Sequence, residues 1–303
     1  MYIGNSDTLL QTKCFEKYSG KVQLIFTSPP FPLVRQKRYR NYSGQAYVDW
    51  LAKYALLFKK LLTKDGSVVL EIGNSWEIGQ PVMSTTVLKA LLAFLEKSKF
   101  HLCQEFIWYN PARLPSPAQW VNIERIRVKD AFTRIWWMSP SQYPKADNTR
   151  VLQEYSSSMR DLLRKQTYNA GKRPSEHSIG EFSFLKNNGG AIPPNVFNGN
   201  LIPNLCNLLK VSNTRPLEKY HLYCDEKGIV PHPARMPQEI PEFFLRFLTD
   251  KQDIVLDPFA GSNTTGYVAD QLDRRWVSIE SNKDYARGSK GRFDSKSFRK
   301  RRR

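Results

Sequence analysis

Short apolar runs alternate with longer amphipathic stretches over roughly the first 140 residues. Val22–Phe26 is apolar at almost every position, as in a strand buried inside a sheet. Apolar side chains then recur at helical spacing between about residues 45 and 62, which predicts an amphipathic helix. Asp65-Gly66 provides a turn, and Ser67–Ile72 has the pattern of a second buried strand.

The alternation continues on both sides of a less regular middle region. Pro81 suits the first position of a helix, so we expect a helix from Pro81 to about Lys97. Further predicted elements are the strands Leu102–Tyr109, Ala131–Met138, Ile254–Asp257 and Trp276–Glu280, and the helices Pro237–Thr249 and Thr264–Leu272. Alternating strands and helices predict an α/β fold, a doubly wound and mostly parallel sheet covered by helices on both faces.

The periodic pattern is lost near residue 141. Residues 141–230 contain scattered Pro, Asn, Ser and Gly with isolated basic residues, which indicates a loop-rich insertion. We therefore expect one α/β domain divided into residues 1–140 and 231–285, with residues 141–230 inserted between the two halves. Residues 286–303 contain nine Lys or Arg residues, and we expect them to form a disordered basic tail.

Charge and cysteine content narrow the class of protein. The 46 Lys and Arg residues against 28 Asp and Glu give a net charge of +18, which favours a polyanionic partner such as nucleic acid. The four cysteines form no C-x-x-C pair, so neither a metal site nor a disulfide framework is predicted. Met1–Asn5 lacks the features of a signal peptide, and no apolar stretch reaches membrane-spanning length. We expect a cytoplasmic protein with no membrane partner.

The strand at Val22–Phe26 runs into Ser28-Pro29-Pro30-Phe31. Proline cannot donate a ladder hydrogen bond and keeps the preceding residue out of the helical region, so this loop is rigid and extended. It fixes the Ser28 hydroxyl, the Pro29 carbonyl and the Phe31 ring. Two acceptors and a stacking ring suit a flat base that carries an amino group. The alternative is a purely structural end to the strand.

A second loop follows the strand Ile254–Asp257 and consists of small residues. Its candidate binding residues are Asp257, Phe259, Gly261, Ser262, Asn263 and Thr264. Small residues let a ligand approach the backbone closely, and the start of the following helix offers free N–H groups to a carboxylate. Glu280 ends the next strand, where it can accept hydrogen bonds from ribose hydroxyls. A plain tight turn with a surface glutamate is the alternative.

The two loops lack the motifs of two common nucleotide-binding sites and favour a different kind of site. No G-x-G-x-x-G is present, as nicotinamide binding would require, and no Gly-Lys-Ser/Thr closes a phosphate-binding loop. Together the loops indicate a nucleobase amino-methyltransferase that uses S-adenosyl-L-methionine. An amino nitrogen conjugated to a base is a poor nucleophile, so acceptors at Ser28 and Pro29 would free its lone pair for a direct, well-aligned displacement. A base inside a duplex must first be flipped out.

Glu71 is the nearest candidate for a second acid, because it lies at the end of the strand Ser67–Ile72. It would orient the amino group or take up its proton. An ordinary strand-end carboxylate is an equally good interpretation of the sequence.

In this order the two loops resemble the beta-class DNA amino-methyltransferases of restriction-modification systems, in which the catalytic loop precedes the cofactor loop. Cytosine-N4 members carry S-P-P-F or S-P-P-Y, as Ser28–Phe31 does, whereas adenine-N6 members usually carry D-P-P-Y or N-P-P-Y. Similarity to the PvuII-type cytosine-N4 group includes the segments Tyr2–Ser6, Arg127–Ala131, Gly190–Asn195, His232–Arg235 and Gly261–Gly266. Asn263 stands where the commoner family loop has glycine.

The resemblance spans about residues 1–285 and implies a methyltransferase fold with permuted motif order. It implies a site-specific prokaryotic enzyme that methylates N4 of a flipped cytosine in double-stranded DNA, acting on the nucleoid. Ser28–Phe31 would be catalytic, and Asp257, Phe259, Gly261 and Glu280 would line the cofactor pocket. Residues 141–230 would be the target-recognition region. A cognate restriction endonuclease would be a genetic companion and not a bound subunit.

Two groups of residues are candidates for DNA contact. Arg35, Lys37, Arg38 and Arg40 follow the catalytic loop among tyrosines, where they could neutralise phosphates beside an extruded base. Arg173 and His177 lie in the predicted recognition region and could contact bases or backbone. A solvated charge run and an ordinary capping histidine are the alternatives.

Other functions are separated from this one by specific residues. Cytosine-C5 methylation needs an attacking thiolate, and no Cys here follows a Pro. A zinc deaminase would carry H-x-E and P-C-x-x-C, which are absent from the sequence. Adenine-N6 methylation and a non-catalytic DNA-binding protein both stay open. Cofactor binding without DNA would separate the non-catalytic protein from the enzyme.

Overall fold

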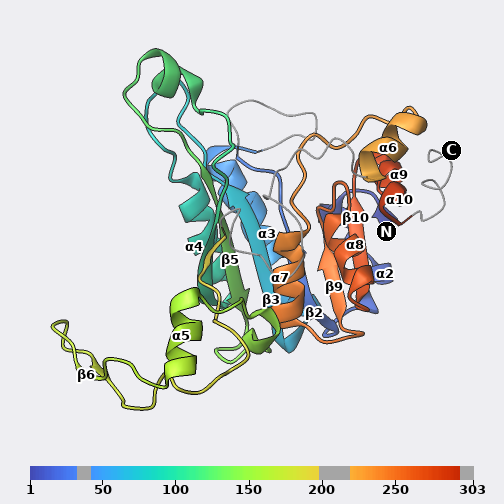
Figure 1. Ribbon diagram of the computed structural model, residues 1–303. Coiled ribbons are helices and arrows are strands. Elements are labelled where there is room, and N and C mark those ends of the chain that lie inside the picture. The colour runs from blue at the N-terminus through green and yellow to red at the C-terminus, as the bar shows by residue number, and fades with distance from the viewer. Residues whose placement is uncertain (33–41, 198–218, 294–303) are drawn as a thin grey trace, which may run out of the picture.

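One eight-stranded sheet organises the residues that the computed structural model describes, 1–32, 42–197 and 219–293 (Figure 1). In spatial order its strands are β1 (Tyr2–Ile3), β10 (Arg275–Glu280), β9 (Ile254–Asp257), β2 (Val22–Thr27), β3 (Leu62–Gly73), β5 (Phe132–Ser139), β4 (His101–Tyr109) and β8 (Val196–Phe197). Neighbouring strands are parallel except that β5 is antiparallel to both β3 and β4. The predicted mostly parallel sheet is confirmed.

Helices cover both faces of this sheet. On one face α3 (Gly44–Leu61) and α4 (Thr86–Ser98) bury Phe58 and Phe94 in a core shared with the strands. On the other face α7 (Glu239–Leu248) and α8 (Thr264–Gln271) bury Phe244 and Val268 in a second core. Figure 1 shows the sheet between these two layers, with α7 and α8 toward the viewer. The arrangement is the predicted doubly wound α/β fold.

The remaining elements are short. They are the helices α1 (Ser6–Leu9), α2 (Lys13–Glu16), α5 (Ser157–Lys165), α6 (Lys219–Glu226), α9 (Lys283–Gly288) and α10 (Lys290–Phe293), a π-helical stretch η1 (Gln119–Ile123), a 3-10 turn η2 (Asn148–Val151), and a two-stranded hairpin of β6 (Gly171–Lys172) and β7 (Ser178–Ile179). No helix within the described ranges combines the length and apolar character that a membrane span requires.

The helix expected from Pro81 begins five residues later, at Thr86. Trp76 and Met83 instead form an isolated antiparallel bridge, and the Ser84 N–H donates to the Ser75 carbonyl (2.8 Å). This turn uses the backbone groups that a helix would need, so Pro81 lies in the turn. The expectation of a helix beginning at Pro81 was therefore wrong, although most of that helix is present.

The first part of the expected disordered tail is folded. Residues 286–293 complete α9 and form α10, and the Arg292 side chain is buried. Its guanidinium donates to the Ser262 carbonyl (2.7 Å) and hydroxyl (2.9 Å) and lies 5.0 Å from the ring of Tyr220. Phe293 stacks on Trp276 with ring centroids 5.2 Å apart. Placing the tail from residue 286 was wrong for this stretch, and residues 294–303 lie outside the described part of the chain.

The direction of β5 decides where the inserted region leaves the sheet. Because β5 is antiparallel to β3, the chain after Ser139 emerges at the edge where the parallel strands begin. There the Lys145 N–H donates to the Asp65 carbonyl, and Lys145 Nζ lies 2.8 Å from Asp253 Oδ2. Figure 1 shows α5 and the β6–β7 hairpin projecting beyond that edge. The chain returns to the sheet only at β8, which runs parallel to β4.

Candidate active site

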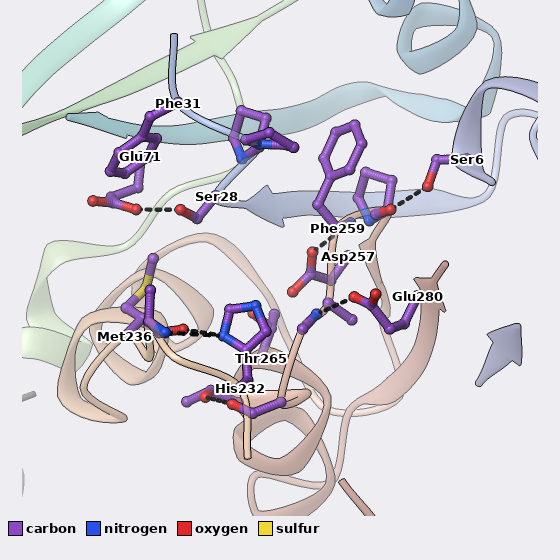
Figure 2. A pocket seen from close by; sticks show the side chains of 18 of the residues that line it. Ser6, Ser28, Phe31, Glu71, His232, Met236, Asp257, Phe259, Thr265 and Glu280 are labelled. Atoms are coloured by element: carbon purple, nitrogen blue, oxygen red, sulfur yellow. Dashed lines mark hydrogen bonds between the residues drawn. The ribbon is translucent and has the colours of Figure 1, made fainter. Parts of the chain in front are cut away.

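The two loops singled out in the sequence meet at the carboxyl edge of the sheet. β2 and β9 are parallel neighbours, so the residues that follow them lie side by side although about 230 positions separate them in sequence. Thr27 Oγ1 donates to Asp257 Oδ1 at 2.6 Å and joins the end of one strand to the end of the other. Figure 2 shows Ser28 and Glu71 on one side of the cavity and Asp257, Phe259 and Glu280 on the other.

The catalytic loop presents a hydroxyl that is paired with a buried acid. The Ser28 hydroxyl donates to Oε2 of Glu71, which projects from β3. Burial raises the pKa of Glu71 to about 7, against the smaller lowering effects of the Ser28 hydrogen bond and of the Arg113 charge. A carboxyl group that titrates near neutrality can exchange a proton under physiological conditions. The structure brings Glu71 to the cavity and into contact with Ser28, and its role in the reaction stays a prediction.

Phe31 is held against a glycine. A Cβ added to Gly73 would lie 2.7 Å from the Phe31 ring, so the ring rests directly on the backbone at the end of β3. Pro29, Pro30 and Phe31 all line the cavity. The four residues predicted to be catalytic therefore border a single space.

Arg113 forms part of the cavity wall beside Glu71. Its Nη1 donates to the Phe132 carbonyl at 2.9 Å and lies 3.9 Å from Asp130 Oδ2. Asn74 Nδ2 donates to Asp130 Oδ1 at 3.0 Å. These contacts tie the ends of β3, β4 and β5 together and fix one positive charge at the site. No pattern in the sequence distinguishes Arg113 from the other basic residues.

The second loop is organised by two acids, the buried Asp257 and the half-buried Glu280. Asp257 Oδ1 also accepts the Phe259 N–H (3.1 Å), and burial raises the pKa of Asp257 to about 6. Glu280 accepts the N–H groups of Gly261 (2.8 Å) and Asn282 (2.7 Å), and burial raises its pKa above the ordinary value. Oε1 accepts the Asn282 N–H and also the Ser281 hydroxyl (3.5 Å), whereas Oε2 accepts the Gly261 N–H and retains a second lone pair for a ligand hydroxyl.

Gly261 is needed for its conformation and for the space above it. Its φ is +52°, and a Cβ there would lie 3.1 Å from Nε2 of His232. His232 in turn meets the edge of the Tyr285 ring at a centroid distance of 4.6 Å. Burial lowers the pKa of His232, which favours a neutral ring. His232 and Tyr285 both line the cavity.

Asn263 is the one predicted cofactor residue that does not line the cavity. It is fully buried behind the loop, with a φ of +57°, and its Oδ1 accepts the Ser278 hydroxyl at 2.7 Å. Glycine adopts this left-handed conformation most readily, and asparagine tolerates it. The structure thus places Asn263 behind the cavity wall, and its contact with a ligand stays a prediction. Ser262 and Thr264 do line the cavity.

The cavity between the loops has a volume of about 490 Å³, within the usual range for sites that bind small molecules. Aromatic residues that the sequence analysis did not assign to the site also border it, namely Tyr42, Trp50, Tyr54 and Trp108. Phe259 packs against Trp50 and Tyr54 at centroid distances of 5.5 and 5.1 Å. Tyr54 belongs to the apolar helical pattern of residues 45–62 and Trp50 lies one turn before it on α3, and this pattern gave no sign of the cavity.

The predicted DNA-contacting residues are only partly placed. Arg35, Lys37, Arg38 and Arg40 lie outside the described residues. Arg173 and His177 belong to the β6–β7 hairpin region, where the Arg173 N–H donates to the His177 carbonyl at 2.8 Å. Neither residue lines the cavity, and the hairpin projects beyond the opposite edge of the sheet (Figure 1). Their contact with DNA stays a prediction.

Comparison with known proteins agrees with this geometry. A family model described as DNA methylase matches residues 22–291. The chain is 42% identical over 295 residues to the type II methyltransferase M.PvuII of Proteus hauseri, an alignment covering 97% of this chain and 83% of that protein. The solved PvuII DNA methyltransferase (cytosine-N4-specific) superposes with a TM-score of 0.74 and 36% identity, covering 98% of this chain and 86% of that one.

A more distant solved structure shares the fold. M1.HpyAVI, solved in complex with SAM, superposes with a TM-score of 0.53 and 20% identity and covers 97% of this chain and 98% of that one. The predicted resemblance to amino-methyltransferases is confirmed by the family match and by the relative that aligns along almost the whole chain. The chain belongs to the DNA methylase family.

Proposed function

We propose that this protein transfers a methyl group from S-adenosyl-L-methionine to the exocyclic N4 of cytosine in double-stranded DNA. The observation that carries the proposal is the Thr27–Asp257 contact, which places the Ser-Pro-Pro-Phe loop and the small-residue loop on one cavity. M.PvuII and the cytosine-N4-specific PvuII structure support the choice of base. The label "type II" of M.PvuII further supports a restriction-modification role, with a cognate endonuclease as genetic companion.

The residues present fit the cofactor. Glu280 Oε2 keeps a lone pair for a ribose hydroxyl, and the Gly261 backbone packs closely against His232, which lines the same cavity. Phe259 adds an apolar surface on the same side of the cavity (Figure 2). A polar lining is completed by Asp257 at the end of β9, Ser262 in the loop, and Thr264 and Thr265 at the start of α8. When bound, S-adenosyl-L-methionine supplies an electrophilic methyl group on a sulfonium centre.

The other side of the cavity suits the amino-bearing base. Phe31 offers a ring face for stacking, and its position is fixed by Gly73. The Ser28 oxygen can accept an N4–H bond while its own proton is donated to Glu71. This arrangement orients the amino group and weakens its conjugation with the ring, so the nitrogen lone pair becomes available for in-line attack.

Glu71 can then accept the proton that the methylated nitrogen loses. Once N4 gains a methyl group, the nitrogen carries a positive charge and must lose one proton. Ser28 Oγ can receive that proton while passing its own to Glu71 Oε2, which restores the neutral amino group. With a pKa of about 7, Glu71 is ionised often enough to act as this base at neutral pH. We infer that Ser28 and Glu71 act as a single unit.

Transfer of labelled methyl groups tests the proposal. Purified protein and methyl-labelled S-adenosyl-L-methionine are incubated with unmethylated plasmid DNA, or with RNA of similar length. We expect label on DNA and not on RNA, and its loss with the Ser28→Ala variant. Cofactor binding without transfer to either polymer would contradict the proposed function.

A further inference from the structure

An ordered arm rises from the wall of the cavity between β4 and β5. It consists of residues 110–131, a connection of 22 residues where strands joined as a hairpin usually need two to five. Asn110 and Arg113, at its base, line the cavity. Figure 1 shows the arm, in green, projecting beyond the carboxyl edge of the sheet. The arm therefore stands directly beside the cavity.

The arm is held in one shape by its own contacts. The Asn110 N–H donates to the Ala131 carbonyl at 2.8 Å, and the Asp130 N–H donates to the Ser116 carbonyl at 3.1 Å. Lys129 Nζ donates to the Pro111 carbonyl at 2.7 Å. Arg127 Nε donates to the carbonyl of Pro81, in the neighbouring turn, at 2.9 Å. A preorganised arm can bind a partner with little loss of conformational entropy.

Large aliphatic side chains on the arm face solvent. Leu114 is 81% exposed, Ile123 69%, Ile126 49% and Val128 88%. All four lie on the same projection between residues 114 and 128, and exposed apolar surface of this kind is common at sites of interaction. The arm is therefore built to contact a partner with accessible apolar surface.

The charge of the arm points to a polyanion. It carries Arg113, Arg125, Arg127 and Lys129 against Glu124 and Asp130. Asp130 is occupied at the base by Arg113 and Asn74, and Glu124 accepts a hydrogen bond from Gln119 at 3.0 Å. Among the described residues Arg125 has neither an ion pair nor a side-chain hydrogen bond, and it is exposed. Aliphatic groups beside a free guanidinium match duplex DNA, whose grooves expose sugar and base surfaces between phosphates.

We propose that residues 110–131 form a DNA-binding arm that packs its aliphatic side chains into a groove beside the target cytosine, while Arg125 neutralises a phosphate. This inference rests on the proposed function for the identity of the polymer. It differs from the assignment of recognition to residues 141–230, because the β6–β7 hairpin lies at the opposite edge of the sheet. The arm instead adjoins the catalytic cavity directly.

Matched variants test the arm. The variant Ile123→Ser/Val128→Ser removes two of the four exposed aliphatic side chains of the arm. The control is Leu56→Ser/Leu92→Ser, because Leu56 (52% exposed) and Leu92 (65% exposed) lie on α3 and α4. Fluorescence anisotropy with a labelled DNA duplex gives the dissociation constant of the protein–DNA complex. The measurement does not depend on methyl transfer. We expect the arm variant to bind at least about tenfold more weakly and the control to stay within about twofold of the original protein.

The salt dependence of DNA affinity tests the role of the Arg125 charge. Arg125→Gln should reduce the slope of log affinity against log salt by about one, and Lys89→Gln on α4 should leave it unchanged. Calorimetric titration with S-adenosyl-L-methionine should give the original affinity for every variant, which also reports that the proteins are folded. Arm variants that bind DNA like their controls would overturn the inference. Failure of the unaltered protein to bind S-adenosyl-L-methionine would instead refute the proposed function.

Discussion

Replacing Glu71 by glutamine separates its role as an acceptor from its role as a base. Glutamine keeps the size of the side chain and an oxygen that can accept the Ser28 hydroxyl, but it cannot take up a proton. General-base catalysis typically contributes about 10² to 10⁴ in rate. We therefore expect Glu71→Gln to lower the rate constant of methyl transfer by at least about a hundredfold, with cofactor affinity close to that of the original protein.

The pH dependence carries the more specific prediction. With a pKa of about 7, Glu71 is about half ionised at pH 7 and about one tenth ionised at pH 6. The rate constant should thus rise about tenfold per pH unit below 7 and level off above it. The Glu71→Gln variant should lack this dependence near pH 7, because its remaining rate needs no carboxylate.

The assay is single-turnover transfer of labelled methyl to duplex DNA between pH 5.5 and 9, at saturating cofactor. Saturation matters because the pKa of Asp257 is about 6, and its ionisation can affect cofactor binding. The double variant Ser28→Ala/Glu71→Gln should be little slower than the worse single variant, as expected for residues that act as a unit. A Glu71→Gln enzyme that keeps the original rate, or keeps the change near pH 7, would refute the assigned role.

The contacts of Ser28, Gly73 and Arg292 and the burial of Glu71 each have a measurable consequence. Ser28→Ala should lower turnover strongly and leave cofactor affinity near normal in a binding titration; loss of binding would contradict its placement on the base side of the cavity. Gly73→Ala should force the Phe31 ring to move, at a cost of about 1 to 3 kcal/mol, and should raise KM for DNA without changing cofactor affinity. Arg292→Ala should destabilise the protein by about 2 to 3 kcal/mol in denaturant unfolding, since two hydrogen bonds to Ser262 are lost; Arg287→Ala, at an exposed position, is the control. Folding raises the pKa of Glu71 from 4.5 to about 7, so ionisation of Glu71 should lower the free energy of unfolding by on the order of 3 kcal/mol as pH rises through that interval. Glutamine does not ionise. The stability of Glu71→Gln relative to the original protein should therefore increase from pH 4.5 to 7 and then stay constant.

Periodicity was enough to predict most of the sheet and its covering helices. Val22–Phe26 and Ile254–Asp257 are short apolar runs, and both become neighbouring buried strands. The loops after them could be predicted because proline and small residues have strong local effects on the backbone. The carboxyl edge of a parallel sheet then brings such loops together.

The parts that could not be predicted depend on contacts between distant residues. Arg292 lies in a basic run, and only the fold reveals that it is buried against Ser262. The left-handed backbone at Asn263 turns its side chain behind the loop, which residue type alone does not indicate. Apolar patterning does not give the direction of a strand, so the antiparallel course of β5 could not be foreseen. That course moves Arg173 and His177 away from the cavity.

The identity of the methylated base tests the central claim most directly. Duplex DNA treated with the protein and methyl-labelled S-adenosyl-L-methionine is digested to nucleosides, and the products are identified by mass spectrometry against synthetic standards. The Ser28-Pro29-Pro30-Phe31 loop beside Glu71 predicts labelled N4-methylcytosine. Labelled N6-methyladenine would contradict the assignment of base, and labelled C5-methylcytosine would contradict the whole mechanism of attack by an amino nitrogen.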